Sequence, residues 1–257
     1  MSSTEAPTIT LHWLEKSRAQ RTLWLLEELK VPYQVKTYKR NAQMRGDPAL
    51  KNVHPLGKSP LLTVGDRAVA ESAFISEYLC DHFAAGPEST LVPAKWQPGR
   101  EGQLGGETDA WMLYRYYMHY AEGSLMSAML MKLVPFGMAH APAPFYIRPI
   151  LSRIAARVEQ TLEPECKAHF DFLEAQLASA PEGGPYLCGP NLTAADILMS
   201  FPVMMSQEGA SAMYGRVTEK TYPKLWAYCE LLKGIESRKR AVEKIIEIEG
   251  SYDEKLL

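Results

Sequence analysis

Residues 58–60 of the chain, Lys58-Ser59-Pro60, could bind an extended, charged ligand. They directly precede an apolar run at 61–64 that has the pattern of a buried strand. A cis bond before a proline has a modest cost, and here it would turn the N–H and C=O of Ser59 outward to pair with an extended peptide. A trans proline that blunts an edge strand is an equally good explanation of the same residues.

A second pair, Glu71-Ser72, stands at the expected start of a helix over 73–83. The free N–H groups of a helix N-terminus favour anions, so Ser72 could bind a carboxylate while Glu71 pairs with an ammonium group. Lys58 could hold a second carboxylate at the other end of the ligand. Glutathione has this layout: a γ-glutamyl head, a cysteinyl middle and a glycyl carboxylate. Ordinary helix capping is the alternative role for Glu71 and Ser72.

The elements that must position these residues follow from the residue pattern. We expect strands at 8–13 and 33–38 around a helix from Ser17 to about Lys30, then a hairpin over 61–70 and the helix over 73–83. Ser17 and Gln20 form the pattern of a capping box at the start of the first helix. The first two strands should be parallel, joined by a right-handed crossover. This β-α-β-β-α order, with Ser-Pro before the third strand, predicts a thioredoxin-like fold.

Strand patterns disappear after a stretch rich in glycine and proline. The expected elements there are a long helix at 109–134, a loop at 135–149 that could cover a pocket as a flap, a helix at 150–180 broken near Pro164, a helix at 193–204, and one or two helices at 224–244. We therefore expect an α+β protein with a thioredoxin-like domain at 7–86, a linker at 87–105 and an all-α helical bundle at 106–257.

The overall composition excludes several classes of protein. With 257 residues, 46% of them hydrophobic, and a net charge of −2, the chain is typical of a globular protein with no nucleic-acid or anionic-membrane partner. No apolar run is long enough for a membrane span, and the first residues lack the order of a signal peptide, so we expect a cytoplasmic location. Four widely separated cysteines indicate a reducing compartment. We expect no metal site, and an ordinary surface or core pair is the favoured reading of His119 and Glu122.

Four stretches of the chain resemble the cytosolic glutathione transferase superfamily: HPLGKSPLL, AESAFISEYL, GPNLTAADILMSFP and SRAQRTLWLLEELKVPY. The resemblance extends over nearly the whole length, and HWL, SRA and YKR near the start are similar to fungal members of the yeast type. It implies a thioredoxin-like N-terminal domain, a helical C-terminal domain, and a homodimer that binds glutathione as co-substrate. The residues expected to bind glutathione are Lys58, Ser59, Pro60, Glu71, Ser72 and Arg18.

Transfer requires glutathione as its thiolate, and a hydroxyl or amide donor near the sulfur lowers the thiol pKa. Family members place a Tyr, Ser or Cys just after the first strand, but residues 12–18 contain neither Tyr nor Cys. The usual Ser position aligns near Leu14. Ser17 is the only hydroxyl in the segment, and it either stabilises the thiolate or only caps the helix. Arg18 either assists through its charge or lies at the surface.

We therefore expect an enzyme that conjugates the glutathione thiolate to small hydrophobic electrophiles. Glutathione peroxidase activity on organic hydroperoxides is a close variant, and a non-catalytic protein that binds glutathione or hydrophobic ligands is the alternative. The residues that either line the electrophile pocket or pack in the core are Trp111, Tyr114, Arg115, Tyr116, Tyr117, Met118 and Tyr120. Thr193 and Asp196 form a capping-box pattern, to which we assign a folding role.

Overall fold

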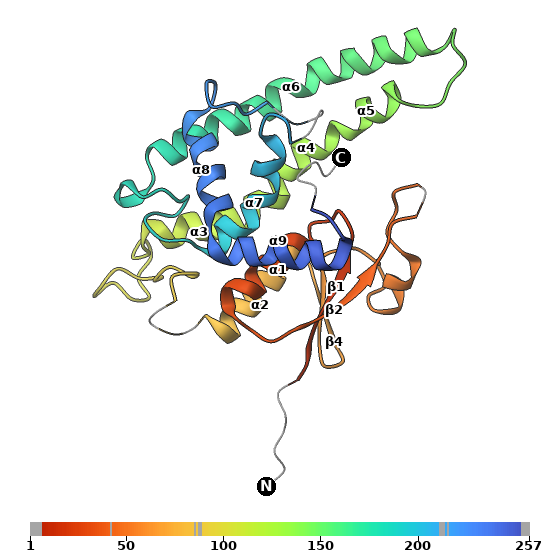
Figure 1. Cartoon of the computed structure of the whole chain (residues 1–257). Coiled ribbons are helices and arrows are strands. Elements are labelled where there is room, and N and C mark those ends of the chain that lie inside the picture. Colours follow the sequence, from red (N-terminus) through yellow and green to blue (C-terminus); the bar gives the residue numbers. More distant parts are fainter. Residues whose placement is uncertain are drawn as a thin grey trace.

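The computed structural model of the chain describes residues 7–41, 43–84, 86, 89–210, 214 and 216–252. Its first part is a four-stranded sheet in the order β2-β1-β3-β4, made of β1 (Ile9–Leu14), β2 (Gln34–Tyr38), β3 (Leu61–Val64) and β4 (Arg67–Ala70). β1 and β2 are parallel, and β3 is antiparallel to both of its neighbours. With α1 (Ala19–Leu29) and α2 (Ser72–Phe83), this part confirms the predicted β-α-β-β-α order and thioredoxin-like fold (Figure 1).

The start of α1 differs from the prediction. The helix begins at Ala19 instead of Ser17, and its N-cap residue, Arg18, makes no capping bond through its side chain. The Ser17 hydroxyl instead accepts a hydrogen bond from the Ala19 N–H at 3.2 Å, two residues along the chain. This short local turn takes the place of the capping box with Gln20, so Ser17 lies just outside the helix.

The second part is helical. Its elements are α3 (Asp109–Tyr120), a π-helical turn η2 (Ala121–Met126), α4 (Ser127–Met131), α5 (Leu133–Ala139), α6 (Arg148–Ala178), α7 (Ala194–Ser206), α8 (Pro223–Gly234) and α9 (Glu236–Glu249). Short 3₁₀ turns lie at Pro48–Asn52 and Pro181–Gly183. The predicted helical bundle is confirmed, but the predicted break at Pro164 is wrong. The carbonyl that loses its partner there belongs to an exposed residue, Gln160, so water can replace the lost bond.

The predicted loop at 135–149 is also wrong, because much of it is helical. α5 packs against the first half of α6, and the two project from the body as a helical hairpin, here named the arm (residues 131–157) (Figure 1). The segment that joins them, 140–147, forms the tip of the arm, away from the sheet. It therefore does not cover the thioredoxin-like domain as the expected flap.

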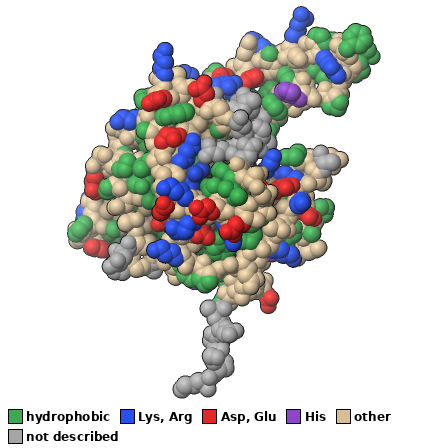
Figure 2. Space-filling view, viewed as in Figure 1, with side chains coloured by type: hydrophobic (Ala, Val, Ile, Leu, Met, Phe, Trp, Pro, Cys, Tyr) green, Lys and Arg blue, Asp and Glu red, His purple; other side chains and the backbone are tan. Residues whose placement is uncertain are grey.

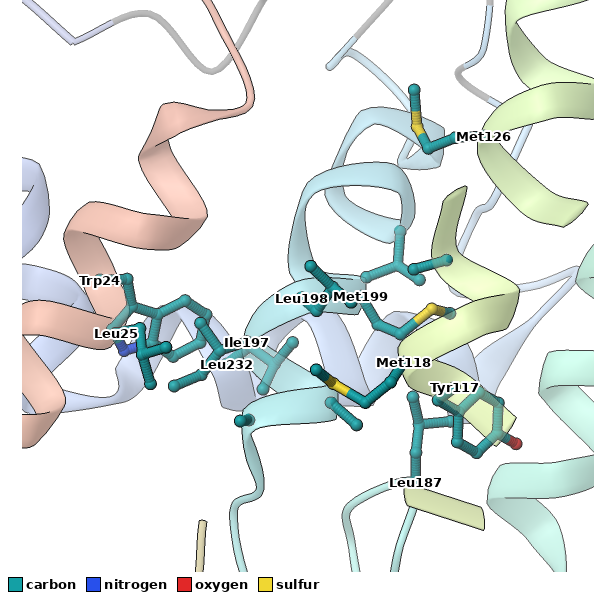
Figure 3. Packing of buried hydrophobic residues seen from close by; sticks show 14 of the residues in the cluster. Trp24, Leu25, Tyr117, Met118, Met126, Leu187, Ile197, Leu198, Met199 and Leu232 are labelled. Atoms are coloured by element: carbon teal, nitrogen blue, oxygen red, sulfur yellow. The ribbon is translucent and has the colours of Figure 1, made fainter. Parts of the chain in front are cut away.

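The core is centred on α7, which packs against α1, α2, α3, η2 and α8. Figure 3 shows Ile197, Leu198 and Met199 of α7 between side chains of α1 and α3. The Asp196 carboxylate accepts bonds from the Thr193 N–H at 2.8 Å, the Leu187 N–H at 3.0 Å and the Tyr228 hydroxyl at 2.8 Å. This buried network joins the start of α7 to the preceding loop and to α8. It confirms that Thr193 and Asp196 serve folding.

Helix α1 lies between the sheet and the helical part. It packs against α7 and α9. The indole N–H of Trp24 in α1 donates a hydrogen bond to the Ser237 hydroxyl of α9 at 2.8 Å. On β1, the Trp13 indole donates to Glu249 at the end of α9 over 2.7 Å. The two parts therefore share one apolar core. None of the helices in the described residues combines the length and the apolar character that crossing a membrane requires.

Candidate functional site

The peptide bond between Ser59 and Pro60 is cis, as the first of the two interpretations predicted. Pro60 is buried at the start of β3, Ser59 is partly exposed, and the Lys58 side chain is exposed beside them. Gly57 has a φ of 55°, and a Cβ atom added there would lie 2.8 Å from Cγ of Lys51. The glycine thus permits the turn into the cis segment, which leaves the backbone of Ser59 at the surface.

Ser17 lies directly beside the cis segment. Its Oγ is 3.0 Å from Oγ of Ser59, although the two residues are 42 positions apart. The Ser17 side chain is buried, and it is fixed by the bond from the Ala19 N–H at the start of α1. A ligand paired with the backbone of Ser59 would therefore place its central side chain close to the Ser17 hydroxyl.

Glu71 and Ser72 form the other end of the site, between β4 and α2. Glu71 has a φ of 71° and a ψ of 118°, a backbone conformation that costs a non-glycine residue about 1–3 kcal/mol. Its side chain is exposed, and no hydrogen bond or ion pair within the described ranges occupies its carboxylate. Ser72 is buried at the first position of α2. A free carboxylate beside a helix N-terminus can receive a ligand that carries both an ammonium and a carboxylate group.

A partly buried charge network supports Ser72, and its two central members are Arg21 and Glu122. The residue pattern assigned no role to Arg21, and it indicated only an ordinary pair with His119 for Glu122. Nη2 of Arg21 donates to Oγ of Ser72 at 3.3 Å and also to the carboxylate of Glu122, which lies in the π-helical turn η2. Arg18 donates to the same carboxylate at 2.7 Å. Arg18 therefore contacts the helical part through Glu122. Its expected role in glutathione binding stays a prediction. In the sequence, Arg21 is a charged residue within the largely apolar run of α1, and this pattern could have indicated a buried charge.

The electrostatics of the network favour a permanent ion pair. Burial lowers the pKa of the Arg21 guanidinium, and the charge and hydrogen bond of Glu122 oppose that change. An arginine keeps its proton in proteins, so the buried cation depends on Glu122 for compensation. Because π-helical turns are frequent at functional sites, the position of Glu122 in one agrees with a role in shaping the site.

Two other nucleophilic side chains of the thioredoxin-like part, His12 and Cys80, are buried. The ring of His12 is buried between the Tyr38 hydroxyl, at 3.0 Å, and the Thr63 hydroxyl, at 3.2 Å, and burial together with Lys36 lowers the pKa of this histidine. Burial raises the pKa of the Cys80 thiol to about 12, as is typical of a cysteine packed in an apolar core. Among the described residues, no three or more His, Cys, Asp or Glu side chains gather as metal ligands.

Most of the candidate pocket residues on α3 belong to the core. The buried ones are Tyr114, Tyr117, Met118 and Tyr120. Tyr116 is exposed and stacks on Tyr120 with ring centroids 5.3 Å apart. Arg115 pairs with Glu77 of α2, so it joins the two parts of the molecule. Trp111 is partly buried, with the ammonium group of Lys95 at 4.9 Å from its ring centroid.

Comparisons with known proteins agree with this geometry. A family model described as the glutathione S-transferase N-terminal domain matches residues 6–81. The chain is 34% identical to glutathione S-transferase 1 of Saccharomyces cerevisiae, covering 93% of this chain and 95% of that protein. It is 30% identical to glutathione S-transferase 3 of Schizosaccharomyces pombe, over 92% and 88% of the two chains.

Solved structures have the same fold over the whole length. A glutathione S-transferase from Actinobacillus pleuropneumoniae superposes with a TM-score of 0.68 at 27% identity, covering 97% of this chain and 99% of that one. A glutathione transferase from Phanerochaete chrysosporium, solved with oxidized glutathione, has a TM-score of 0.67 at 16% identity, over 97% and 100% of the two chains. The sequence and the structure together establish that the chain belongs to the glutathione S-transferase family.

Proposed function

We propose that this transferase conjugates the glutathione thiolate to small hydrophobic electrophiles, with Ser17 as the catalytic residue. The observation that supports this most directly is the 3.0 Å contact between the hydroxyls of Ser17 and Ser59 beside the cis peptide bond. It puts a fixed hydroxyl next to the backbone that would hold the cysteinyl part of glutathione. A hydroxyl donor at the sulfur stabilises the thiolate and so lowers the thiol pKa.

In the proposed complex, glutathione lies between the cis segment and the start of α2. The backbone N–H and C=O of Ser59 pair with the cysteinyl residue, while Pro60 holds that backbone outward. Ser72 and the N-terminus of α2 bind the γ-glutamyl carboxylate, and Glu71 pairs with the adjacent ammonium group. Lys58 pairs with the glycyl carboxylate at the other end. Arg18 contributes indirectly, through the Glu122 carboxylate that it shares with Arg21.

The chemical step follows from this arrangement. The thiolate sulfur attacks an electrophilic carbon of the second substrate, a carbon–sulfur bond forms, and the leaving group departs with the electron pair of the broken bond. The Ser17 hydroxyl keeps the sulfur anionic before attack, and the bound geometry supplies orientation. The same thiolate would also attack the outer oxygen of an organic hydroperoxide: a sulfur–oxygen bond forms, the O–O bond breaks, and the alcohol leaves after taking up a proton. A second glutathione thiol then attacks the sulfur of the resulting sulfenic acid, which gives glutathione disulfide and water and completes the proposed peroxidase reaction.

We also propose a homodimer through α2 and α3. Phe74, Met112 and Tyr116 are exposed on these two helices, which the Arg115–Glu77 pair holds together. Exposed apolar side chains grouped in this way are typical of an interface. If the patch is the interface, Phe74→Glu sediments as a monomer while wild type sediments as a dimer. We keep the cytoplasmic location, the fungal origin and the domain limits 7–86, 87–105 and 106–257 as proposals.

Two measurements test the proposed function. Retention on immobilised glutathione tests binding, and turnover of 1-chloro-2,4-dinitrobenzene with glutathione tests conjugation. Wild type is expected to pass both. Retention without turnover of this electrophile or of cumene hydroperoxide would support the alternative, a non-catalytic binding protein. If wild type is not retained on immobilised glutathione, the proposed glutathione-binding site is contradicted.

A further inference from the structure

The arm exposes an unusual amount of apolar surface for a part that projects from the body. At its tip, Phe145 is 82% exposed and Tyr146 is 64% exposed, and the centroids of their two rings lie 5.5 Å apart in an edge-to-face arrangement. The other exposed apolar side chains of the arm and its base are Leu130, Met131, Leu133, Val134, Phe136, Ile147, Ile150 and Ile154. Figure 2 shows such hydrophobic side chains along the arm and at its tip.

The charge of the arm has a single sign. Residues 123–158 contain no Asp or Glu, whereas Lys132, Arg148, Arg153 and Arg157 are basic. The three arginines are exposed, and none of them takes part in an ion pair among the described residues. In the net charge of −2 for the whole chain, the positive charges of this segment are cancelled by acidic residues elsewhere. A local partner with negative charge is therefore compatible with a nearly neutral protein.

The apolar and basic groups are arranged along one side of α6. Ile147, Ile150 and Ile154 recur at helical spacing and form one exposed stripe, and Arg153 and Arg157 lie beside it. The arm is also fixed at its base, where the buried Lys132 ammonium donates to Glu163 of α6 at 2.6 Å. A rigid hairpin thus presents an apolar stripe, flanking arginines and two aromatic rings at its end.

We propose that the arm docks on an anionic lipid surface, with Phe145 and Tyr146 inserted among the headgroups and the α6 stripe lying against the acyl boundary. An amphipathic helix with basic residues beside its apolar face binds a membrane interface in this way. Aromatic rings are favoured at the level of the headgroups. The arginines pair with lipid phosphates, and each basic residue near an anionic surface strengthens binding by about fivefold.

Charge argues against a second copy of the chain as the occupant. A symmetric contact between two arms would place Arg148, Arg153 and Arg157 of one copy against the same residues of the other. The arm offers no carboxylate to compensate them, because its acidic residues begin only at Glu159. A lipid surface supplies that compensation without any matching side chain.

Co-sedimentation with vesicles tests the proposal, using phosphatidylcholine alone or with about one third phosphatidylserine. Wild type is expected to bind the anionic vesicles, and to lose most of that binding at high salt, because screening weakens charge attraction. Phe145→Ser/Tyr146→Ser and Arg153→Glu/Arg157→Glu should each bind at least about tenfold more weakly. Leu104→Ser and Arg100→Glu change exposed residues of the same kinds outside the arm, one apolar and one basic, and these variants should bind as wild type does.

Three results would overturn the proposal. In the first, wild type fails to bind anionic vesicles at low salt. In the second, it binds but both arm variants bind equally well, so another surface is responsible. In the third, vesicle binding is absent and the aromatic variant sediments as a smaller species than wild type, which identifies a second copy as the occupant. Circular dichroism melting confirms that each variant is folded before it is compared.

Discussion

Replacing Ser17 by alanine tests the catalytic assignment most directly. The change removes the hydroxyl that lies 3.0 Å from Oγ of Ser59 and leaves the backbone of the cis segment intact. A hydrogen bond to a charged group is worth about 1.5–3 kcal/mol, which corresponds to a rise of about 1 to 2 in the pKa of the bound thiol. We expect the lower end of this range, because Ser59 Oγ at 3.0 Å competes for the single Ser17 proton.

The expected signature is therefore a pH-dependent loss of rate. Below the thiol pKa, the thiolate fraction of bound glutathione and kcat with 1-chloro-2,4-dinitrobenzene should fall about 10-fold or somewhat more, while well above it kcat should recover. The KM for glutathione should change little, because in the proposed complex Ser17 contacts neither end of the tripeptide. Ultraviolet titration of the bound thiolate measures the same pKa without turnover.

Ser76→Ala is the matched control. Ser76 is also buried, and its hydroxyl donates to the Ser72 carbonyl at 2.9 Å within α2. Losing that bond should cost about 1 kcal/mol of stability and leave the thiol pKa unchanged. If Ser17→Ala keeps the wild-type kcat at every pH and the wild-type thiol pKa, another donor stabilises the sulfur and our assignment of Ser17 is wrong.

Three further variants test the binding site and the ion pairs. Glu71→Gln should raise the KM for glutathione about tenfold with a small effect on kcat, since it removes one charge-assisted bond to the ammonium group; an unchanged KM in steady-state kinetics would contradict this. Glu122→Gln leaves the buried Arg21 cation uncompensated and should cost about 2–4 kcal/mol of stability in urea unfolding, together with a higher KM; equal stability would contradict the network. Burial alone would raise the pKa of Glu163, but the hydrogen bond and charge of Lys132 hold it below its usual range. This pair therefore stabilises the fold above about pH 4 and is lost as the pH falls through the lowered pKa, so Glu163→Gln should flatten the acid side of the stability profile measured by urea unfolding.

The sequence predicted the first part of the fold well because its signals are local. The β-hairpin at 61–70 has a short turn containing Gly65, and Ser59-Pro60, directly before it, is an X-Pro bond, the kind of peptide bond at which the cis form has a low cost. The candidate binding residues Ser59 and Glu71-Ser72 lie beside these elements, so their positions followed from the same pattern. Ser17 was placed at the start of a helix, and its contact with Ser59 could not be read from the sequence because it joins distant segments.

The rest depends on tertiary contacts that leave little trace in the residue pattern. Arg21 interrupts an apolar run, but only the fold shows that Glu122 reaches it from a π-helical turn. The prolines of 135–149 suggested a loop, although Pro135 and Pro149 lie within the first turn of α5 and of α6, where a proline is tolerated. The arm also shows why the net charge of a whole chain gives little information about one exposed segment.

The position of α1 between the sheet and α9 has a consequence for how the chain can be divided. The bonds of Trp24 to Ser237 and of Trp13 to Glu249 join the first elements of the sequence to the last helix. A fragment cut in the 87–105 segment would expose the apolar side of α1 and the Arg21 charge to water. A chimera of this first half with the helical half of a relative would therefore also need the residues of α7 and α9 that contact α1. The interface between the two halves is part of the folding core.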